Sequence, residues 1–433
     1  MKKYILNLLV FSAILSAQTS PTIYWVDATN GNDNSAGTTE ATAWKTIHKV
    51  FVQSLFKQTV VDTVKVKAGT YDFEDGEIYT NSNYDFVLIG IEGSSKTIFD
   101  AGNKNRHMSI DDGQSNKTKI QGITFQNGFT NYWPGGGSIF LTYGSDVQFI
   151  DCIWQNNSTN GQEGGGAIII RDGATPSFTG CTFKGNYVNN TDGGNYGGAV
   201  NIQWPNSKAE LESTVKFKKT KFIDNYLKVK HSAYGGAVRS ERNVAFENCL
   251  FVNNRVIANN DGTGSEAVGG AIYFNSKYWN GSSNDGGVMK IVNSTFHGNY
   301  IQTLDPNYSN MYGGTISYGS HDGNANSKTY IFNTIVSGSK QLIEQTERTQ
   351  YDNNDYIVNK IIGTGNTSGY KLTLDHSNIL NQKIWHHPRP RYRYRHYSQS
   401  HYYSQTDNFR IPHSFHWQRH HRRHYASLSN NYR

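Results

Sequence analysis

The sequence predicts an all-β protein, a single-stranded right-handed parallel β-helix with a capping helix at its N-terminal end. Its composition and two short, alternating repeats predict this class. The 433 residues include 43 Gly, 28 Tyr and 21 Phe but only 8 Pro. Aromatic residues favour strands and glycines favour turns, and the sequence contains no long helix-forming run. The two repeats then decide how the strands are arranged.

The first repeat is a Gly-Gly pair followed by a small residue and usually a β-branched one. It occurs at Gly136-Gly137, Gly165-Gly166, Gly197-Gly198, Gly235-Gly236, Gly269-Gly270 and Gly313-Gly314. Glycine accepts positive φ and leaves no side chain to meet a neighbouring coil. We therefore expect each pair at a corner where one strand bends into the next.

The second repeat is an aromatic residue followed three places later by Asn. The pairs are Trp154 with Asn157, Phe183 with Asn186, Phe222 with Asn225, Phe251 with Asn254 and Phe296 with Asn299, after an opening Phe125. The aromatics are spaced by 29, 29, 39, 29 and 45 residues. Units of this length cannot fold alone and must stack on one another. We expect the aromatics to stack inside and the Asn residues to adopt the left-handed turn conformation.

The three cysteines, Cys152, Cys181 and Cys249, occupy one equivalent place in three units. Thr220 and Ser294 hold that place in two others. A position shared with Thr and Ser favours a small buried filler over a disulfide or a metal ligand.

The N-terminus has the pattern of a secretory signal peptide over residues 1–17. A basic start is followed by an apolar run from Tyr4 to Leu15 and by Ser16-Ala17, and we expect cleavage after Ala17. No later stretch is apolar over the roughly 18 residues that a spanning helix needs. The sequence thus predicts a secreted, extracellular or cell-surface protein, whose association with an outer membrane would not use a transmembrane helix.

The combination of Gly-Gly-Ala-Ile with Phe-x-x-Asn resembles the repeat of the polymorphic outer membrane protein family, within the pectate-lyase-like β-helix superfamily. The segments Tyr24-Trp25-Val26-Asp27 and Ala68-Gly69-Thr70-Tyr71 are similar to the opening of many secreted β-helix proteins. The resemblance covers residues 22 to 340. It implies the fold and export, and it assigns no chemistry.

The repeats divide the chain into further segments. Residues 22–118 are expected to form the N-terminal cap and first coils, 119–340 the repeats, and 341–383 a last coil or linker. Trp44, Ile47, Phe51 and Leu55 follow helical spacing, so a short amphipathic helix should begin near Ala43, with Thr42 as its cap, and cover the open end.

The tail, residues 384–433, does not share the composition of the repeats. It holds nine His, nine Arg and one acid, Asp407. The tail therefore accounts for the net charge of +7 and leaves residues 1–383 near −1. A nucleic-acid arm is disfavoured in an exported protein, and a metal-binding His tract lacks a fixed ligand spacing. We favour a frameshift in the gene or its reading, which resequencing would test.

Two columns of side chains after the Gly-Gly corners are predicted to face outward and to form a binding strip. The candidate ligand-binding residues on it are Arg171, Asp172, Asn201, Gln203, Trp204, Arg239, Glu241 and Tyr273. An extended glycan or peptide could lie there, with an arginine holding the carboxylate of an acidic sugar. The alternative is that these outward residues are polar only because they meet water.

No catalytic residue can be assigned from the sequence. A hydrolase needs two paired carboxylates, and Asp151, Asp172, Asp224 and Glu241 cannot be paired by sequence. A lyase needs a base and often Ca²⁺. Asp27, Asn32 and Asp33 could hold Ca²⁺, although a loop is favoured there and at Asp111-Asp112, and no other cofactor or metal is expected.

The predicted function is that of an adhesin-like secreted or surface protein that presents an extended face. Its partner would be an extracellular polysaccharide or cell-surface macromolecule, and not a nucleic acid. The alternative is a polysaccharide lyase or another carbohydrate-active enzyme on the same scaffold, because the fold alone does not decide function.

Overall fold

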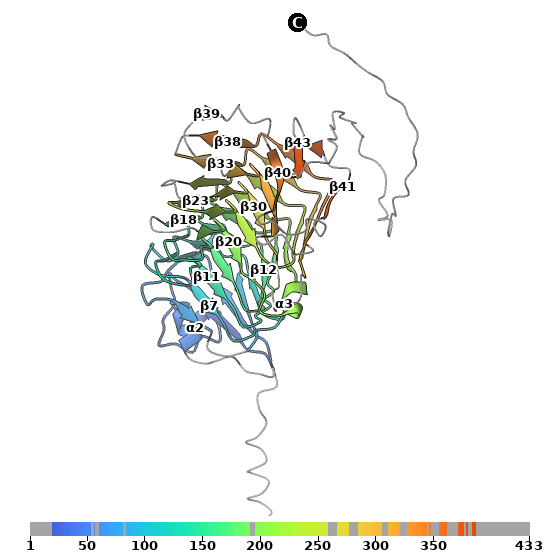
Figure 1. Ribbon diagram of the computed structural model, residues 1–433. Coiled ribbons are helices and arrows are strands. Elements are labelled where there is room, and N and C mark those ends of the chain that lie inside the picture. The colour runs from blue at the N-terminus through green and yellow to red at the C-terminus, as the bar shows by residue number, and fades with distance from the viewer. Residues whose placement is uncertain are drawn as a thin grey trace, which may run out of the picture. The chain divides into compact units, whose positions relative to one another are not determined.

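The chain is a right-handed parallel β-helix, which confirms the predicted fold class (Figure 1). The computed structural model describes residues 20–52, 56, 60–80, 84–190, 195–258, 266–276, 285–304, 311–320 and 327–343, and the strands at 346–347, 355–361, 371–375, 378–379 and 383–386. The predicted signal peptide and the tail beyond residue 386 lie outside the described residues. Lys383–His386 form a strand of the helix, so its last coil includes the first three residues of the predicted tail.

Three long sheets form the main body, and we number all sheets in the order in which one coil passes through them. Sheet 1 contains β1 (Ile23–Val26), β2 (Asp62–Val66), β5 (Phe86–Gly90), β8 (Lys119–Gln121), β12 (Gln148–Ile150), β16 (Ser177–Thr179), β21 (Val215–Lys218), β26 (Val244–Glu247), β31 (Val288–Val292), β36 (Lys328–Phe332) and β41 (Lys371–Asp375). Sheet 2 contains β3 (Gly69–Asp72), β6 (Thr97–Asp100), β9 (Thr124–Gln126), β13 (Ile153–Gln155), β17 (Thr182–Lys184), β22 (Lys221–Ile223), β27 (Leu250–Val252), β32 (Thr295–His297), β37 (Ile335–Ser337) and β42 (Asn378–Ile379). Sheet 5 contains β4 (Ile78–Tyr79), β7 (Met108–Ile110), β11 (Ile139–Leu141), β15 (Ile168–Ile170), β20 (Val200–Ile202), β25 (Val238–Ser240), β30 (Ile272–Phe274), β35 (Ile316–Ser320), β40 (Asp355–Ile361) and β43 (Lys383–His386).

Two shorter sheets lie between sheets 2 and 5 along each coil. Sheet 3 contains β10 (Phe129–Thr130), β14 (Ser158–Thr159), β18 (Tyr187–Asn190), β23 (Tyr226–Val229), β28 (Arg255–Ala258), β33 (Tyr300–Thr303), β38 (Lys340–Ile343) and β39 (Thr346–Glu347). Sheet 4 contains β19 (Asn195–Tyr196), β24 (Ala233–Tyr234), β29 (Ala267–Val268) and β34 (Met311–Tyr312). Among the described strands, the final pair β38 and β39 is antiparallel. Sheets 3 and 4 enclose a second apolar cluster that includes Val188, Leu227, Val256 and Met311.

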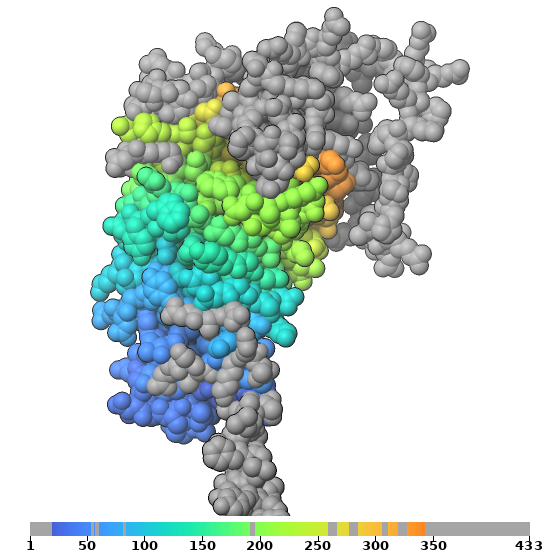
Figure 2. All heavy atoms as spheres, turned by 60° about the horizontal axis from the view of Figure 1, so that its bottom comes forward, coloured from blue at the N-terminus to red at the C-terminus, as the bar shows by residue number. Residues whose placement is uncertain are grey.

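The aromatic repeat forms the continuous core that its spacing predicts. Trp154 and Phe183 are direct partners in neighbouring strands of sheet 2, and their ring centroids lie 4.7 Å apart. Phe251 and Phe296 repeat this stack at 4.5 Å. Successive coils therefore follow one another as bands of colour in the space-filling view (Figure 2). Each such aromatic contact stabilises the core by about 0.5–1.5 kcal/mol beyond its buried area.

The repeated asparagines form a buried ladder rather than the left-handed turn, so this part of the prediction is wrong. The Asn157 side chain donates to the Phe125 carbonyl at 3.0 Å, and its backbone N–H donates to the Asn186 side-chain oxygen at 3.1 Å. The same contacts recur at Asn186, Asn225 and Asn254. The left-handed residue is the one before, as at Asn156 with φ of 56°. A buried amide must find partners, and here it finds them in both neighbouring coils.

The two glycines of each corner have different reasons to be glycine. The first takes the positive φ that the prediction requires, with 70° at Gly165 and 77° at Gly235. The second lies under the next coil, because a Cβ on Gly166 would collide with the Gly198 carbonyl. Both parts of the prediction are confirmed.

The cysteine prediction is confirmed as well. Cys152, Cys181 and Cys249 are free and buried. The Cys181 thiol contacts the Phe149 carbonyl, and the Thr220 hydroxyl makes the equivalent contact with the Phe178 carbonyl at 3.3 Å. The position needs a small side chain that can donate to the coil before it.

The predicted capping helix from Ala43 is not confirmed. Trp44 instead forms a parallel bridge with Val26, after a 3₁₀ turn at Glu40–Thr42. The helix that follows, α2, covers only His48–Val52 and buries His48 and Val50. Tight packing of Trp44 on strand β1 overrides the helical spacing. A membrane-spanning helix is not found among the described residues, whose helices are too short to cross a bilayer.

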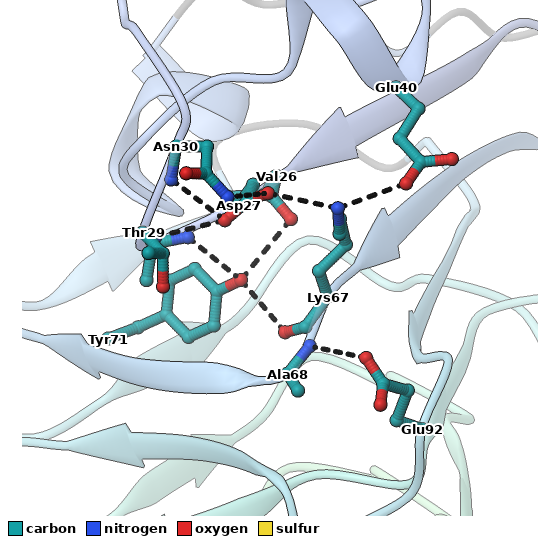
Figure 3. A network of polar contacts seen from close by, with 10 residues as sticks. Val26, Asp27, Thr29, Asn30, Glu40, Lys67, Ala68, Tyr71 and Glu92 are labelled. Carbon is teal, nitrogen blue, oxygen red and sulfur yellow. Dashed lines mark hydrogen bonds and ion pairs between the residues drawn. The ribbon is translucent and has the colours of Figure 1, made fainter.

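A network of polar contacts ties the first coils together at the N-terminal end (Figure 3). Asp27 accepts the backbone N–H of Thr29 at 2.9 Å and of Asn30 at 3.0 Å, and lies 3.1 Å from the Lys67 ammonium. Burial alone would raise the pKa of Asp27, but these hydrogen bonds outweigh it and lower the pKa to about 2. The Tyr71 hydroxyl donates to the Lys67 carbonyl at 2.9 Å. The network fixes the turn that follows β1.

Candidate functional site

The register of sheet 5 brings the residues of each predicted column together in successive coils. Arg239 lies between Asn201 and Tyr273 in one column. Arg171, Gln203 and Glu241 follow the strands of three successive coils in the other. The strand ends thus bring the candidate residues onto one face.

The prediction that this face is open to water is wrong for the first column, and in the second column Thr142 and Gln203 are buried as well. Asn201, Arg239 and Tyr273 are buried. Sheet 4 covers them, because Tyr196, Tyr234 and Tyr312 pack with Tyr273 just before each Gly-Gly corner. Tyr273 therefore belongs to an internal aromatic cluster and does not line an exposed surface.

Arg171, with 14% of its side chain exposed, lies at the centre of a cluster of charged and aromatic side chains. Its guanidinium lies 3.6 Å from Glu163, 3.7 Å from Asp172 and 4.5 Å from the centre of the Trp133 ring. Its Nε and Nη1 atoms are buried without a hydrogen-bond partner. Asp172 is held in place by the Thr142 hydroxyl at 2.7 Å and the Asn206 amide at 2.9 Å.

Glu163 links two coils and was missed by the sequence analysis. Its side chain accepts a hydrogen bond from Gln203, and its backbone carbonyl accepts one from Asn201. It takes a φ of 73°, which an acidic side chain rarely adopts. The signal available in the sequence was an acid directly before Gly164-Gly165-Gly166, where a left-handed corner was already expected.

Arg239 and Glu241 form a tight ion pair at 2.5 Å, with 5% and 12% of the side chains exposed. The Arg239 guanidinium also donates to the Asn201 side chain at 3.3 Å and lies over the Tyr196 ring at 3.9 Å. Burial raises the pKa of Glu241, and the negative charge of Glu163 raises it further. Arg239 and a hydrogen bond from the Trp204 backbone lower this pKa, but it stays above its ordinary value. Glu241 Oε2 has no hydrogen-bond partner among the described residues.

Exposed aromatic side chains accompany the charged cluster. Trp133 is 58% exposed, Tyr132 54% and Trp204 47%. Trp204 lies in the insertion that lengthens one unit to 39 residues. The insertion connects sheet 5 to sheet 1 and contains the short helix α3 (Lys208–Glu212). The insertion that lengthens the repeat thus places Trp204 beside Gln203 and Asn206 beside Asp172.

A second ion pair continues the face toward the N-terminus. Arg106 lies 2.9 Å from Glu77 and donates to the carbonyls of Gly135 at 2.7 Å and Gly136 at 2.8 Å. Asp111 occupies the position below Thr142 in the second column. Burial, followed by the neighbouring Asp112 charge, raises its pKa, and its Oδ1 atom is buried without a hydrogen-bond partner.

We call these side chains the sheet 5 strip. It consists of Glu77, Arg106, Asp111, Asp112, Tyr132, Trp133, Thr142, Glu163, Arg171, Asp172, Asn201, Gln203, Trp204, Arg239 and Glu241. Seven of the eight residues predicted from the sequence come together in it, but Asn201, Gln203 and Arg239 are buried, and Tyr273 lies in the internal aromatic cluster. A strip of exposed aromatic rings beside carboxylate, guanidinium and amide groups can stack on a flat ligand and exchange hydrogen bonds with it.

The loop predicted at Asp27, Asn32 and Asp33 has no spare oxygens arranged for a cation. Asp33 accepts the backbone N–H groups of Lys45 at 2.7 Å and Thr46 at 3.0 Å, and the Thr46 hydroxyl at 2.9 Å. Asn32 accepts the backbone N–H of Asn34 at 3.0 Å. No group of three His, Cys, Asp or Glu side chains that could hold a metal occurs in the part of the chain that the structure describes.

Comparisons with known proteins find similar proteins only among solved structures. A rhamnogalacturonan lyase matches at a TM-score of 0.39 and 13% identity, over 75% of this chain and 85% of its own. A pectin methylesterase from carrot matches at a TM-score of 0.33 and 13% identity, over 85% of this chain and 91% of its own. A PL6 family polysaccharide lyase from Pseudopedobacter saltans matches at a TM-score of 0.31 and 10% identity, over 77% of this chain and 91% of its own. No family model and no curated protein matches the sequence, so the resemblance to polymorphic outer membrane protein repeats stays a prediction.

Proposed function

We propose that this protein binds an extended polysaccharide along the sheet 5 strip, as an exported, adhesin-like protein. The observation that carries the proposal is the pair of exposed indoles, Trp133 and Trp204, beside the polar cluster of Glu163, Arg171 and Glu241. Exposed indole faces suit the C–H faces of sugar rings, and the nearby polar groups suit their hydroxyls.

The scaffold spaces these contacts along a line. Trp133 precedes β11, Arg171 follows β15 and Trp204 follows β20, so the three residues belong to successive coils. Neighbouring strands lie about 4.8 Å apart, which is close to the length of one sugar unit in an extended chain. Each coil can therefore offer contacts to one unit of the polymer. Because the coils are rigid, little ordering is needed when the ligand binds.

The partner we propose is an extracellular polysaccharide, in agreement with the expected export by residues 1–17. A nucleic acid is not proposed, because each arginine of the strip is already paired with a carboxylate. Phosphate binding requires free cationic groups.

Affinity electrophoresis of the full chain, through gels that contain soluble polysaccharides, tests the proposal. We expect retardation by at least one polymer, and about tenfold weaker binding for Trp133→Ala and for Trp204→Ala. Trp25→Ala is the matched control, because Trp25 lies on sheet 1. Equal retardation of all four proteins, or no retardation by any polymer, would contradict the proposal.

One observation favours a carbohydrate-active enzyme as the second candidate. Two of the six carboxylates of the strip, Glu163 and Glu241, lie close enough to interact, and the pKa of Glu241 is raised by its burial and by the Glu163 charge. Glycoside hydrolysis uses one protonated and one ionised carboxyl group. New reducing ends that form with the wild type, but not with Glu241→Gln, would select the hydrolase over the adhesin.

A further inference from the structure

We infer that the sheet 5 strip selects uncharged polysaccharides and disfavours uronate polymers. This inference rests on the proposed function and names the class of its ligand. It departs from the expectation that an arginine of this face would hold the carboxylate of an acidic sugar.

The arginines of the strip are not available to an acidic ligand. Arg239 is paired with Glu241 at 2.5 Å and Arg106 with Glu77 at 2.9 Å. Arg171 has two carboxylates, those of Glu163 and Asp172, within 3.7 Å. A uronate would have to displace one of these groups and then remain beside it, and like charges at such distances repel.

Carboxylates also outnumber cations on the strip. Six of them, Glu77, Asp111, Asp112, Glu163, Asp172 and Glu241, face three arginines, Arg106, Arg171 and Arg239. The nearby Arg242 does not change this balance, because it is fully buried and donates to the Ala174 carbonyl at 2.6 Å. The field over the strip is therefore negative, which weakens the approach of a polyanion.

The groups that reach the surface of the strip suit a neutral chain. Trp133 is 58% exposed, Tyr132 54% and Trp204 47%, and stacking on these rings requires no charge on the ligand. The Asp172 side chain is 32% exposed, and its carboxylate can accept hydrogen bonds from sugar hydroxyls. A uronate carboxylate has no hydrogen to donate to Asp172 and repels it. The exposed groups therefore describe a site for a neutral, hydroxyl-rich chain.

The sharpest test compares polymers that share a backbone and differ in charge. The full chain is titrated with polygalacturonate and with the same polymer after reduction of its carboxyl groups. Xylan, mannan and β-glucan serve as further neutral probes. We expect at least tenfold tighter binding of the reduced polymer than of its parent. Neutral polymers should bind equally at low and high salt, because screening acts on charges alone.

Glu163→Gln tests the mechanism of discrimination. It removes one negative charge beside Arg171 and keeps the shape, so the affinity for polygalacturonate relative to that for the reduced polymer should rise several-fold. Glu247→Gln is the matched control, since Glu247 is half exposed on sheet 1 and pairs with Lys218. Asp172→Asn repeats the test if Glu163→Gln unfolds.

Each outcome has a clear consequence. Tighter binding of polygalacturonate than of every neutral polymer, lost at high salt, overturns the inference but leaves polysaccharide binding intact. Failure to bind any of these polymers, or binding that Trp133→Ala and Trp204→Ala leave unchanged, contradicts the proposed function itself.

Discussion

Arg239 and Glu241 point from the same face of sheet 5 and meet at 2.5 Å, almost completely buried. Sheet 4 closes over Arg239, whose guanidinium lies against the Tyr196 ring. A charged pair under a second sheet is unusual, because desolvation costs as much as the attraction returns. This buried ion pair lies beside exposed indole rings, and the combination distinguishes this face of the β-helix from an ordinary polar surface.

The pair should be sensitive to the loss of one partner. Arg239→Ala leaves the Glu241 carboxylate buried without a counter-charge, and we expect the free energy of unfolding to fall by about 3–5 kcal/mol. Lys218→Ala is the control, because Lys218 and Glu247 are half exposed and 3.4 Å apart, and should cost at most about 1 kcal/mol. Urea denaturation measures both. Equal small losses would show that the buried pair contributes no more than the exposed one.

The asparagine ladder should carry stability that exposed asparagines do not. Asn225→Ala removes the donor to the Phe183 carbonyl and the acceptor of the Asn186 backbone N–H. Each group left unsatisfied costs about 1–3 kcal/mol, so the loss should exceed about 2 kcal/mol. Asn189→Ala, on the exposed side of β18, should change stability by less than about 0.5 kcal/mol. Similar thermal unfolding of the two variants would refute a structural ladder.

The cysteines should be inert in the folded protein. Burial raises the pKa of Cys152 to about 12 and that of Cys181 well above its usual value, so neither forms a thiolate near neutral pH. A thiol reagent should therefore label the protein only after denaturation. Cys181→Thr should cost less than about 1 kcal/mol, because Thr220 already fills this place one coil later. Rapid labelling of the native protein would contradict this account.

Acid should weaken the N-terminal end first. The pKa of Asp27 in the folded state is about 2, below the ordinary value of 3.8. A lowered pKa means that the ionised carboxylate stabilises the fold above pH 3.8, and that this stability is lost as the pH falls toward 2. Asp27→Asn should remove this part of the pH dependence, measured by urea denaturation across the acid range. The same acid dependence in wild type and variant would exclude Asp27 as its source.

The repeats predicted the register of the fold because inward residues recur at a fixed spacing. Phe183, Phe222 and Phe251 stack at successive coils although their spacing changes from 39 to 29 residues. The insertion leaves the strands unchanged and adds α3 at a corner. Strand pairing and the register of the coils therefore followed from sequence alone.

Other features were beyond reach of the sequence pattern. Sheet 4 consists of strands of two residues, such as Ala233–Tyr234, which are too short to show alternation, so the burial of Arg239 and Tyr273 was not foreseen. The helical spacing from Trp44 was misleading because Trp44 packs against strand β1. Glu163 was missed because a charged residue in a glycine-rich corner has the pattern of an ordinary loop.

The most direct test of the central claim follows the fluorescence of Trp133 and Trp204 during titration with a neutral polysaccharide that retards the wild type. Stacking of a sugar on either indole changes its emission, so the wild type should show a saturable change. Trp25→Ala should retain that change, and the Trp133→Ala/Trp204→Ala double variant should lose it. A change of full amplitude in the double variant would place the polysaccharide elsewhere and contradict a binding strip on sheet 5.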